Sequence, residues 1–267
     1  MEQYLAALAM GVIEGLTEFL PISSTGHLIL LGYAIGFQGP PGKVFEVSIQ
    51  LGAILAVVVI YRQRLMDVIT GMWRPGTAER FYATNIVLAF LPAMVIGATL
   101  HSTITTLLFN PWVVSVALIL GGIAIIVIER RVAVPTIHSV AEIGPLTALL
   151  VGFGQALAMI PGTSRSGATI ITALLCGVDR KAAAEFSFVL AIPTMLAASA
   201  YSLFKTRNEL SADGLGMILV GFVTAFVVAL LVVRWVVAVI GRIGFTPFGW
   251  YRIGLGLVML MVLAAAG

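Results

Sequence analysis

Six apolar stretches, each about as long as a membrane-spanning helix, dominate this 267-residue chain. A helix that crosses the hydrocarbon core of a bilayer needs about 20 apolar residues. The chain is 60% hydrophobic and 10% charged, whereas a soluble domain averages roughly 25% charged residues. The sequence therefore predicts an all-α polytopic membrane protein. The six stretches are 46–61, 82–100, 112–128, 185–204, 214–233 and 248–266.

Two further apolar regions, 3–37 and 143–177, are long enough for two helices each, but polar residues interrupt both at their centres. The first break reads GVIEGLTEFLPISSTGH from Gly11, and the second reads GFGQALAMIPGTSRSGAT from Gly152. Unpaired backbone N–H and C=O groups are costly in hydrocarbon, so irregular backbone is tolerated at membrane depth only when protein buries it or a cavity adjoins it. Both regions are therefore predicted to be broken or re-entrant helical hairpins whose breaks face inward.

The two breaks resemble each other in sequence. Each begins at a glycine, has an amide or carboxylate side chain three residues later and then reaches a proline, and the first glycines, Gly11 and Gly152, are 141 residues apart. Each half then consists of a hairpin and three spans. Because three is an odd number of membrane crossings, the second half has the opposite orientation in the membrane to the first. We therefore expect one membrane domain built as an inverted repeat, with repeat one at about 1–131 and repeat two at about 140–267. A site is expected where such repeats meet.

The basic residues set the expected orientation, because cytoplasmic loops are enriched in Lys and Arg. With this topology most of them fall on one side of the membrane, and the loop from His101 to Pro111 on the other side has none. Lys205 and Arg207 are the exceptions. We expect both termini and the mouth of the first hairpin outside, the second hairpin entering from the cytoplasm, and the two tips meeting near the midplane. The cytoplasmic residues are Arg62, Arg64, Arg74, Arg80, Arg130, Arg131, Arg180, Lys181, Arg234 and Arg242.

Glu14 and Glu18 lie four residues apart in the first break, which places both carboxylates on one helix face, about 5–6 Å apart at Cβ. Two buried carboxylates repel each other unless one is protonated, paired or bound to metal. The pair therefore predicts a cation, with a divalent metal, a shared proton and an arginine as open alternatives. A purely structural pair is the competing interpretation, but ionisable groups inside a membrane are functional by default.

Three consecutive hydroxyl residues, Ser23, Ser24 and Thr25, precede Gly26 and His27. Hydroxyl groups, together with main-chain N–H groups at a turn or a helix start, form a cradle for phosphate oxygens. A histidine exchanges protons near neutral pH, which suits general acid or base catalysis. Helix capping by the hydroxyls and a structural hydrogen bond from the histidine are the competing interpretations.

The second break supplies a positive charge within another hydroxyl-rich turn. Arg165 lies between Ser164 and Ser166, with Thr163 before them and Gly167 after them. A guanidinium binds two phosphate oxygens at once and stays charged in a low dielectric. These five residues are therefore predicted to bind phosphate. The alternative is a salt bridge from the arginine to the glutamates of the first break, with no ligand.

The sequence resembles the bacterial undecaprenyl-diphosphatase family, also called bacitracin-resistance proteins, over essentially its whole length. EGLTEFLPISSTGH and PGTSRSGAT are similar to the two signature segments of that family, and FEVSIQLGAILAVVV, EFSFVLAIP and GFVTAFVVALL extend the resemblance. It implies a multi-pass enzyme of the bacterial inner membrane that removes the terminal phosphate of undecaprenyl diphosphate. It also implies recycling of this lipid carrier for peptidoglycan synthesis, bacitracin resistance, and a pocket open to the periplasmic side.

The same resemblance implies catalytic roles for Glu14, Glu18, Ser24, His27 and Arg165. It further implies a divalent cation, Mg²⁺ or Ca²⁺, which the two glutamates would hold. The expected partners are a prenyl diphosphate lipid and membrane lipids, and a homodimer is left open. Nucleic acid is excluded, since the net charge of +3 comes from a few loops rather than a basic stripe. We expect the serine hydroxyl to attack the terminal phosphorus with the histidine as acid or base, while the histidine or an activated water stays open as nucleophile.

A secondary transporter or a flippase for the lipid carrier is the rival function, since inverted repeats with broken helices are common in secondary transporters. In that case Glu14 and Glu18 would carry protons or sodium ions, and Arg165 would bind an anionic substrate. Release of phosphate in the absence of any membrane gradient distinguishes the two functions.

Overall fold

The computed structural model describes residues 2–37, 39, 44–108, 110–132, 134–205 and 214–266, so that Arg207 lies outside the described residues. Within these residues the chain forms eleven α-helices and one short 3-10 helix, which confirms the predicted all-α architecture. The first half contains α1 (Glu2–Thr17), α2 (Ser24–Ala34), α3 (Val44–Ile60), α4 (Arg62–Gly71), α5 (Ala78–Leu108) and α6 (Pro111–Arg131). The second half contains η2 (Val140–Glu142), α7 (Pro145–Leu157), α8 (Arg165–Leu175), α9 (Arg180–Lys205), α10 (Leu215–Ile243) and α11 (Thr246–Ala266).

Five helices, α5, α6, α9, α10 and α11, are long and apolar enough to cross a membrane, which confirms a multi-pass membrane protein. The predicted span 46–61 corresponds to the 17-residue α3, and at Tyr61 the chain bends by 74° into α4. Counting this bent pair as one broken span gives six candidate spans. The basic loop expected after α3 instead starts with the helix α4, because Arg, Gln, Leu and Met in its first turns all favour helix formation.

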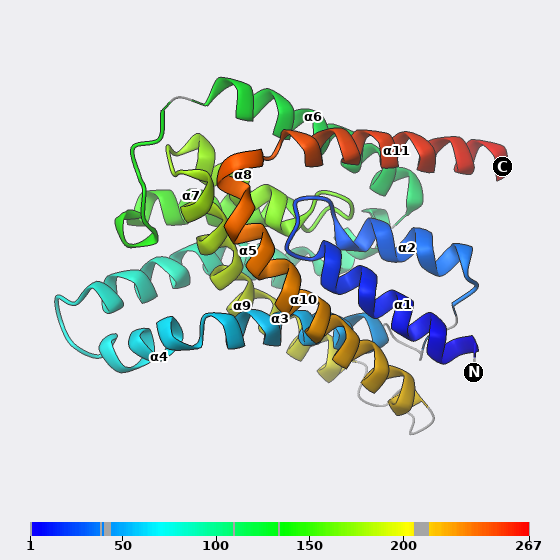
Figure 1. Ribbon diagram of the computed structural model, residues 1–267, viewed down its shortest axis with the longest axis horizontal. Coiled ribbons are helices and arrows are strands. Elements are labelled where there is room, and N and C mark those ends of the chain that lie inside the picture. The colour runs from blue at the N-terminus through cyan, green and yellow to red at the C-terminus, as the bar shows by residue number, and fades with distance from the viewer. Residues whose placement is uncertain are drawn as a thin grey trace.

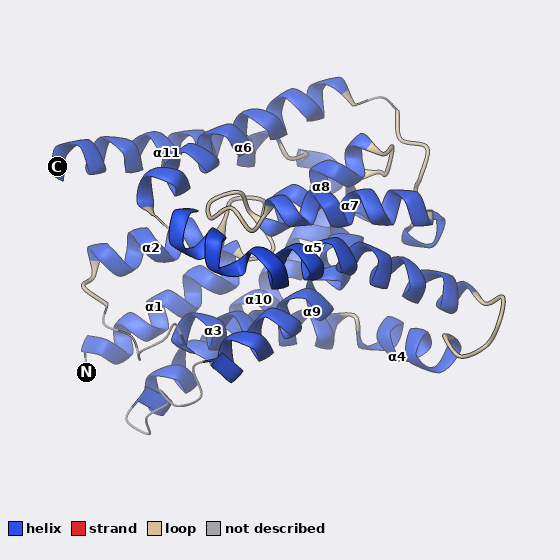
Figure 2. Ribbon diagram, turned by 180° about the vertical axis from the view of Figure 1, so that it is seen from behind, coloured by secondary structure: helices blue, strands red, loops and turns tan. Residues whose placement is uncertain are grey.

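The two interrupted regions form the predicted helical hairpins. The first consists of α1 and α2, and the second of α7 and α8, each with six or seven non-helical residues between its helices: 18–23 and 158–164. Both termini lie at one end of the molecule, and the first hairpin opens toward that end (Figure 1). The second hairpin opens toward the opposite end, where α4 lies, and the loops of the two hairpins approach each other at the centre (Figure 2).

The two hairpins pack in equivalent ways against the opposite half. Helix α1 contacts α10, and its counterpart α7 contacts α5. In both contacts a glycine allows the backbones to approach, since a Cβ atom on Gly11 would lie 2.5 Å from Gly221 O and one on Gly152 would lie 2.5 Å from Ala89 O. Because Gly11 and Gly152 begin the two similar sequence segments, this equivalence supports the inverted repeat. Because each hairpin packs against a helix of the other half, the two halves form one packed unit.

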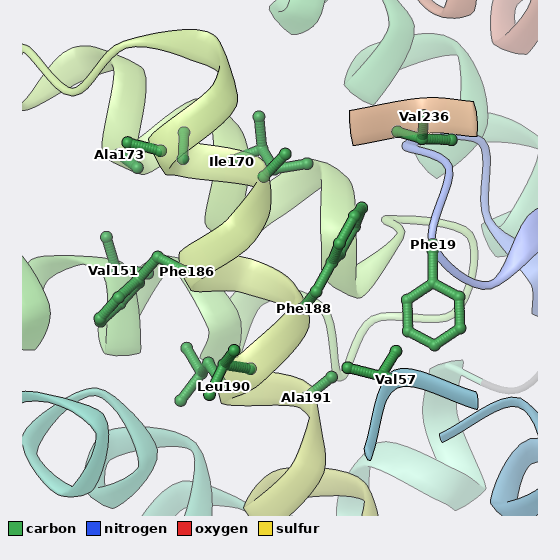
Figure 3. Packing of buried hydrophobic residues seen from close by; sticks show 14 of the residues in the cluster. Phe19, Val57, Val151, Ile170, Ala173, Phe186, Phe188, Leu190, Ala191 and Val236 are labelled. Atoms are coloured by element: carbon green, nitrogen blue, oxygen red, sulfur yellow. The ribbon is translucent and has the colours of Figure 1, made fainter. Parts of the chain in front are cut away.

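Phe19 anchors the first break in the apolar core. Its side chain is fully buried and meets Phe188 of α9 edge to face, with a centroid distance of 5.4 Å. Figure 3 shows this ring beside Phe188 and Val57, among buried residues from α7, α8, α9 and α10. The non-helical residues at this tip are therefore held in place by side-chain packing as well as by hydrogen bonds.

The last turn of α6 fixes the start of α11. The Glu129 carboxylate accepts hydrogen bonds from Phe245 N at 2.8 Å and Thr246 Oγ1 at 2.6 Å, and Arg180 Nε donates to it at 2.8 Å. Gly244, with a φ angle of 67°, makes the sharp turn that ends α10 and brings α11 back along α6. This connection places the second turn of α11, with Tyr251 and Arg252, against the two helix breaks.

The close approach of α7 to α5 leads to a stability prediction. We expect Gly152→Ala to lower the free energy of unfolding by about 1–3 kcal/mol, because the added methyl group overpacks a backbone contact. Gly254→Ala on α11 is the matched control: nothing lies within 4 Å of its Cβ position, and alanine is the better helix former. Thermal unfolding of both variants in detergent measures the difference, and equal melting temperatures would contradict the packing described for α7.

Candidate active site

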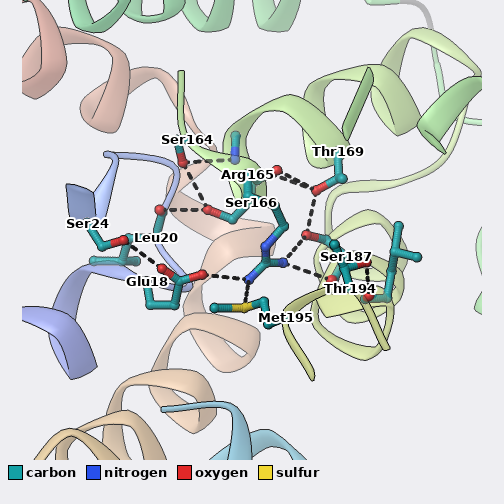
Figure 4. Close-up of polar contacts among 12 residues, drawn as sticks. Glu18, Leu20, Ser24, Ser164, Arg165, Ser166, Thr169, Ser187, Thr194 and Met195 are labelled. Atoms are coloured by element: carbon teal, nitrogen blue, oxygen red, sulfur yellow. Dashed lines mark hydrogen bonds and ion pairs between the residues drawn. The ribbon is translucent and has the colours of Figure 1, made fainter. Parts of the chain in front are cut away.

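The two helix breaks touch at the centre of the molecule. Ser166 Oγ donates a hydrogen bond to Leu20 O at 2.8 Å, and Arg165 Nη2 donates to Glu18 Oε1 at 3.0 Å (Figure 4). The prediction that the hairpin tips meet is therefore confirmed. Each break covers polar groups of the other, which is the condition for irregular backbone inside an apolar layer.

Each break ends in a serine with a positive φ angle. Ser23 and Ser164 both have φ of 70°, and they directly precede α2 and α8. A residue other than glycine in such a conformation costs about 1–3 kcal/mol, and such residues cluster at functional sites. Ser164 Oγ caps α8 by accepting from Gly167 N at 3.2 Å, whereas Ser23 makes no side-chain cap. The positive end of α2 therefore remains available to an anion.

Glu18 connects the two breaks through both of its carboxylate oxygens. Oε2 accepts a hydrogen bond from Ser24 Oγ at 2.6 Å, and Oε1 pairs with Arg165 Nη2 at 3.0 Å. All three side chains are largely shielded from solvent, so the interactions are only weakly screened. A serine hydroxyl bonded to a carboxylate is arranged for nucleophilic attack, because the carboxylate can accept its proton.

Arg165 is held in place by α9 and by the first break. Its Nη1 donates to Ser187 O at 3.0 Å, and Ser187 Oγ is in turn bonded to Thr169 Oγ1 at 2.7 Å. The guanidinium also lies 5.8 Å from the centre of the Phe19 ring. Its Nε atom is buried and has no hydrogen-bond partner among the described residues. A fixed guanidinium with an unpaired donor is suited to binding an anion.

A cavity of about 160 Å³ lies beside this ion pair, between the two breaks, α3 and α9. The structure brings together six of the predicted site residues in its wall: Glu18, Ser23, Ser24, Thr25, Ser164 and Arg165. Gln50 of α3 also lines the cavity. The wall thus combines hydroxyl groups with a guanidinium and a carboxylate, a set that matches phosphate oxygens and a proton acceptor.

A larger and mostly apolar groove of about 500 Å³ adjoins this cavity. The two share part of their walls, including Arg165 and Thr194. The groove runs between α5, α7 and α9 as far as Lys205, and α9 ends at the same end of the molecule as the two termini (Figure 1). A polar cavity that continues into an apolar groove suits a ligand with a charged head and an apolar chain.

His27 does not line this cavity. Its Nδ1 lies 2.8 Å from Ser23 O and its Nε2 lies 2.7 Å from Tyr251 OH, with the two rings stacked. Both ring nitrogens therefore have partners, and Ser24 is bonded to Glu18 instead of to the histidine. A role of His27 as acid or base stays a prediction.

The remaining predicted phosphate-binding residues hold the turns of the two breaks. Thr163 O accepts a hydrogen bond from Arg252 at 2.9 Å, and Ser166 bonds across to the first break. Gly167 N donates to the capping serine, and Gly26 packs against α6. None of these four lines the cavity, so their direct contact with phosphate stays a prediction.

Glu14 lies one helical turn before Glu18 and is 1% exposed. Within the part of the chain that the structure describes, its Oε1 atom has no hydrogen-bond partner, and a buried carboxylate oxygen without a partner requires a cation or a proton. The described residues contain no cluster of three or more His, Cys, Asp or Glu side chains. A pair of carboxylates still fits Mg²⁺ or Ca²⁺, because such ions also take oxygen ligands from water and from substrate phosphates.

Two residues of α11 that the sequence analysis missed complete the site. Tyr251 bonds to His27, and Arg252, 1% exposed, donates hydrogen bonds to carbonyl oxygens of both breaks. The signal was present in the sequence, since an arginine inside an apolar span is by default functional.

Comparisons with known proteins agree with the resemblance of the two signature segments. The family model described as "Bacitracin resistance protein BacA" matches residues 7–258. "Undecaprenyl-diphosphatase 2" of Paramagnetospirillum magneticum is 56% identical over 259 residues, which cover 97% of this chain and 98% of the relative. "Undecaprenyl-diphosphatase" of Sphingopyxis alaskensis is 51% identical over 264 residues, covering 99% of each chain. The relative named "Undecaprenyl-diphosphatase" from Parvibaculum lavamentivorans is 52% identical over 258 residues, which cover 97% of this chain and 96% of the relative.

The buried ion pair leads to a stability prediction. Removing one partner leaves the other charge buried and unpaired, so Arg165→Met is expected to lower the free energy of unfolding by about 3–5 kcal/mol. The double variant Glu18→Gln with Arg165→Met should lose less than the sum of the single variants, since no unpaired charge remains. Unfolding of all four proteins in detergent measures this coupling. Strictly additive effects would show that the two side chains do not interact.

Proposed function

Because the chain belongs to the bacitracin resistance protein family, we propose that it hydrolyses undecaprenyl diphosphate to undecaprenyl phosphate and inorganic phosphate. This reaction returns the lipid carrier to peptidoglycan synthesis and confers resistance to bacitracin. The observation that carries the proposal is the bonding of Glu18 to both Ser24 and Arg165 beside a polar cavity that continues into an apolar groove.

The cavity and the groove match the two parts of such a substrate. The diphosphate would occupy the cavity, where Arg165 and the start of α2 offer positive charge and hydrogen-bond donors. The prenyl chain would leave through the apolar groove between α5, α7 and α9. This arrangement keeps the charged group out of hydrocarbon while the apolar chain stays out of water.

In the proposed mechanism, Ser24 Oγ attacks the terminal phosphorus and its proton passes to Glu18 Oε2, which already accepts its hydrogen bond. The bond from that phosphorus to the bridging oxygen breaks, and undecaprenyl phosphate leaves. Water then attacks the phosphoserine, with Glu18 returning the proton to the departing serine oxygen. Inorganic phosphate is released and Ser24 is regenerated.

Charge stabilisation would supply most of the rate acceleration, since phosphoryl transfer depends chiefly on positioning and electrostatics. Arg165 is already oriented by Ser187 and by Glu18, so little reorganisation is needed when negative charge develops on the transferring group. His27 could exchange a proton only after giving up its bond to Tyr251 or to Ser23. Glu18 is therefore the base that the geometry favours.

A divalent cation fits this site as part of the same proposal. Glu14 and Glu18 would hold it, and the unpartnered Oε1 of Glu14 is the donor that supports this assignment. When bound, Mg²⁺ or Ca²⁺ would neutralise charge on the diphosphate oxygens.

We also propose that the protein lies in the bacterial inner membrane with the site open to the periplasmic side. The groove reaches the end of α9, on the side of the two termini, whereas α4 with Arg62 and Arg64 lies at the other end. The enrichment of basic residues in cytoplasmic loops supports this orientation. Lys205 remains an exception on the outer side.

A phosphate-release assay tests the function. Purified protein in detergent, without a membrane gradient, is expected to release inorganic phosphate from undecaprenyl diphosphate, and a chelator should suppress the release until Mg²⁺ or Ca²⁺ is restored. Arg165→Lys keeps the charge but loses the planar fork, so turnover should fall about 100-fold. Arg234→Lys, at an exposed position of α10, is the control and should match the unmodified protein. No release from any prenyl diphosphate would favour the transport function.

Trapping of a covalent intermediate tests the nucleophile. Acid quenching during turnover of substrate labelled in its terminal phosphate should leave label on the protein, and peptide mapping should place it on Ser24. Ser24→Ala is expected to abolish both the label and turnover, while Ser23→Ala should still become labelled, although more slowly. Normal turnover by Ser24→Ala would rule out the serine and leave an activated water or His27.

A further inference from the structure

Arg252 donates more hydrogen bonds to the two helix breaks than any other side chain described above. It lies in the apolar helix α11, is 1% exposed and donates only to main-chain carbonyl oxygens. The acceptors are Pro21 O at 3.1 Å, Gly162 O at 2.9 Å, Thr163 O at 2.9 Å, Ala117 O at 3.1 Å and Leu118 O at 3.3 Å. One planar guanidinium thus joins the first break, the second break and α6.

The acceptors in the breaks lie next to the two strained serines. Pro21 precedes Ser23 by two residues, and Gly162 and Thr163 directly precede Ser164. A strained backbone conformation persists only where its surroundings determine it strongly. The hydrogen bonds from Arg252 hold both turns in this conformation. The turn at Ser23 is followed directly by Ser24, and the turn at Ser164 by Arg165, which both belong to the ion-pair network.

The surroundings of Arg252 leave room for its guanidinium and give it no opposing charge. A Cβ atom on Gly121 of α6 would collide with Nη2, and one on Gly167 would lie 3.1 Å from Nη1. Within the described part of the chain no carboxylate pairs with Arg252. Its charge is therefore balanced by carbonyl dipoles alone, an arrangement that needs the five donors of a guanidinium and that a lysine cannot reproduce.

We propose that Arg252 is a positioning residue for phosphate transfer: it holds the turns at Ser23 and Ser164 so that the Ser24 hydroxyl and the Arg165 guanidinium face the same substrate. This inference rests on the proposed function. Arg252 does not line the cavity, so it acts through the two turns and not by contact with the substrate. A displacement of about 1 Å at reacting groups can lower a rate about 100-fold, which sets the size of the expected effect.

Three variants test the proposal by kinetics on folded protein. Arg252→Met removes all five donors, Arg252→Lys keeps the charge with fewer donors, and Gly121→Ala displaces the guanidinium while leaving it present. Gly254→Ala and Arg234→Lys serve as controls, since the Cβ position of Gly254 faces open space and Arg234 is exposed. Folded fraction is measured by gel filtration and thermal unfolding in detergent, and kcat and KM for undecaprenyl diphosphate are then expressed per folded molecule.

We expect kcat to fall about 100-fold for Arg252→Met and by a smaller factor for Arg252→Lys and Gly121→Ala, with KM changing much less because the prenyl chain still binds in the groove. Competitive inhibition by orthovanadate, which probes the cavity without turnover, should weaken in the same order. A normal kcat and normal vanadate inhibition in the folded fraction of all three variants would overturn the proposal and leave Arg252 a structural residue. Absence of phosphate release by the unmodified protein would instead overturn the proposed function, whereas vanadate binding would still report on the cavity.

Discussion

Backbone carbonyl and amide groups at the two helix breaks lie in the interior of this multi-pass membrane protein, and the centre of the structure is arranged to satisfy them. A helix forms its own hydrogen bonds, but residues 18–23 and 158–164 cannot do so fully. Their partners come from elsewhere: Ser166 bonds to Leu20, and Arg252 bonds to Pro21, Gly162 and Thr163. Each of these contacts joins elements from different parts of the chain, so satisfying the breaks also fixes how the two hairpins meet.

The two hairpins have the same backbone plan but different chemistry. Each has a closely packed glycine in its first helix, Gly11 or Gly152, and a serine with φ of 70° directly before its second helix, and each packs on a long helix of the opposite half. The first hairpin carries Glu14, Glu18 and the hydroxyl residues, whereas the second has Gln155 where the first has Glu14 and contributes Arg165. This division places the proton acceptor and the anion-binding cation on separate segments, so that the site exists only where the two tips meet.

Two arginines hold this centre together in different ways. Arg165 lines the cavity and pairs with a carboxylate, and its buried Nε has no partner among the described residues, so it can exchange part of its bonding for a phosphate oxygen. Arg252 has no carboxylate partner in the described residues and donates to main-chain carbonyls only. The difference follows from position, because one side chain faces the cavity and the other lies between the breaks and α6. A cation that binds substrate must be able to change partners, whereas a cation that supports the turns must not.

Local rules were enough to predict the apolar spans, both interrupted hairpins, the meeting of their tips and most of the polar side chains in the cavity wall. Bilayer thickness determines how long an apolar segment must be, and the cost of unpaired backbone groups requires Pro21 and Pro161 to lie in buried breaks. The helix α4 after Tyr61 differs from the loop that the basic residues there predict. Two short sequence segments likewise predict a site that contains hydroxyl groups, carboxylates and one arginine.

The sequence by itself therefore determined which segments enter the membrane, where they break and which chemical groups the breaks carry. Only the tertiary structure decided how those groups are paired: Ser24 with Glu18, His27 with Tyr251, and Arg252 with both breaks. His27 and Tyr251 are 224 positions apart in the sequence, and Arg252 and Pro21 are 231 positions apart. No local pattern encodes such a contact, because it depends on which helix faces pack together across the whole chain.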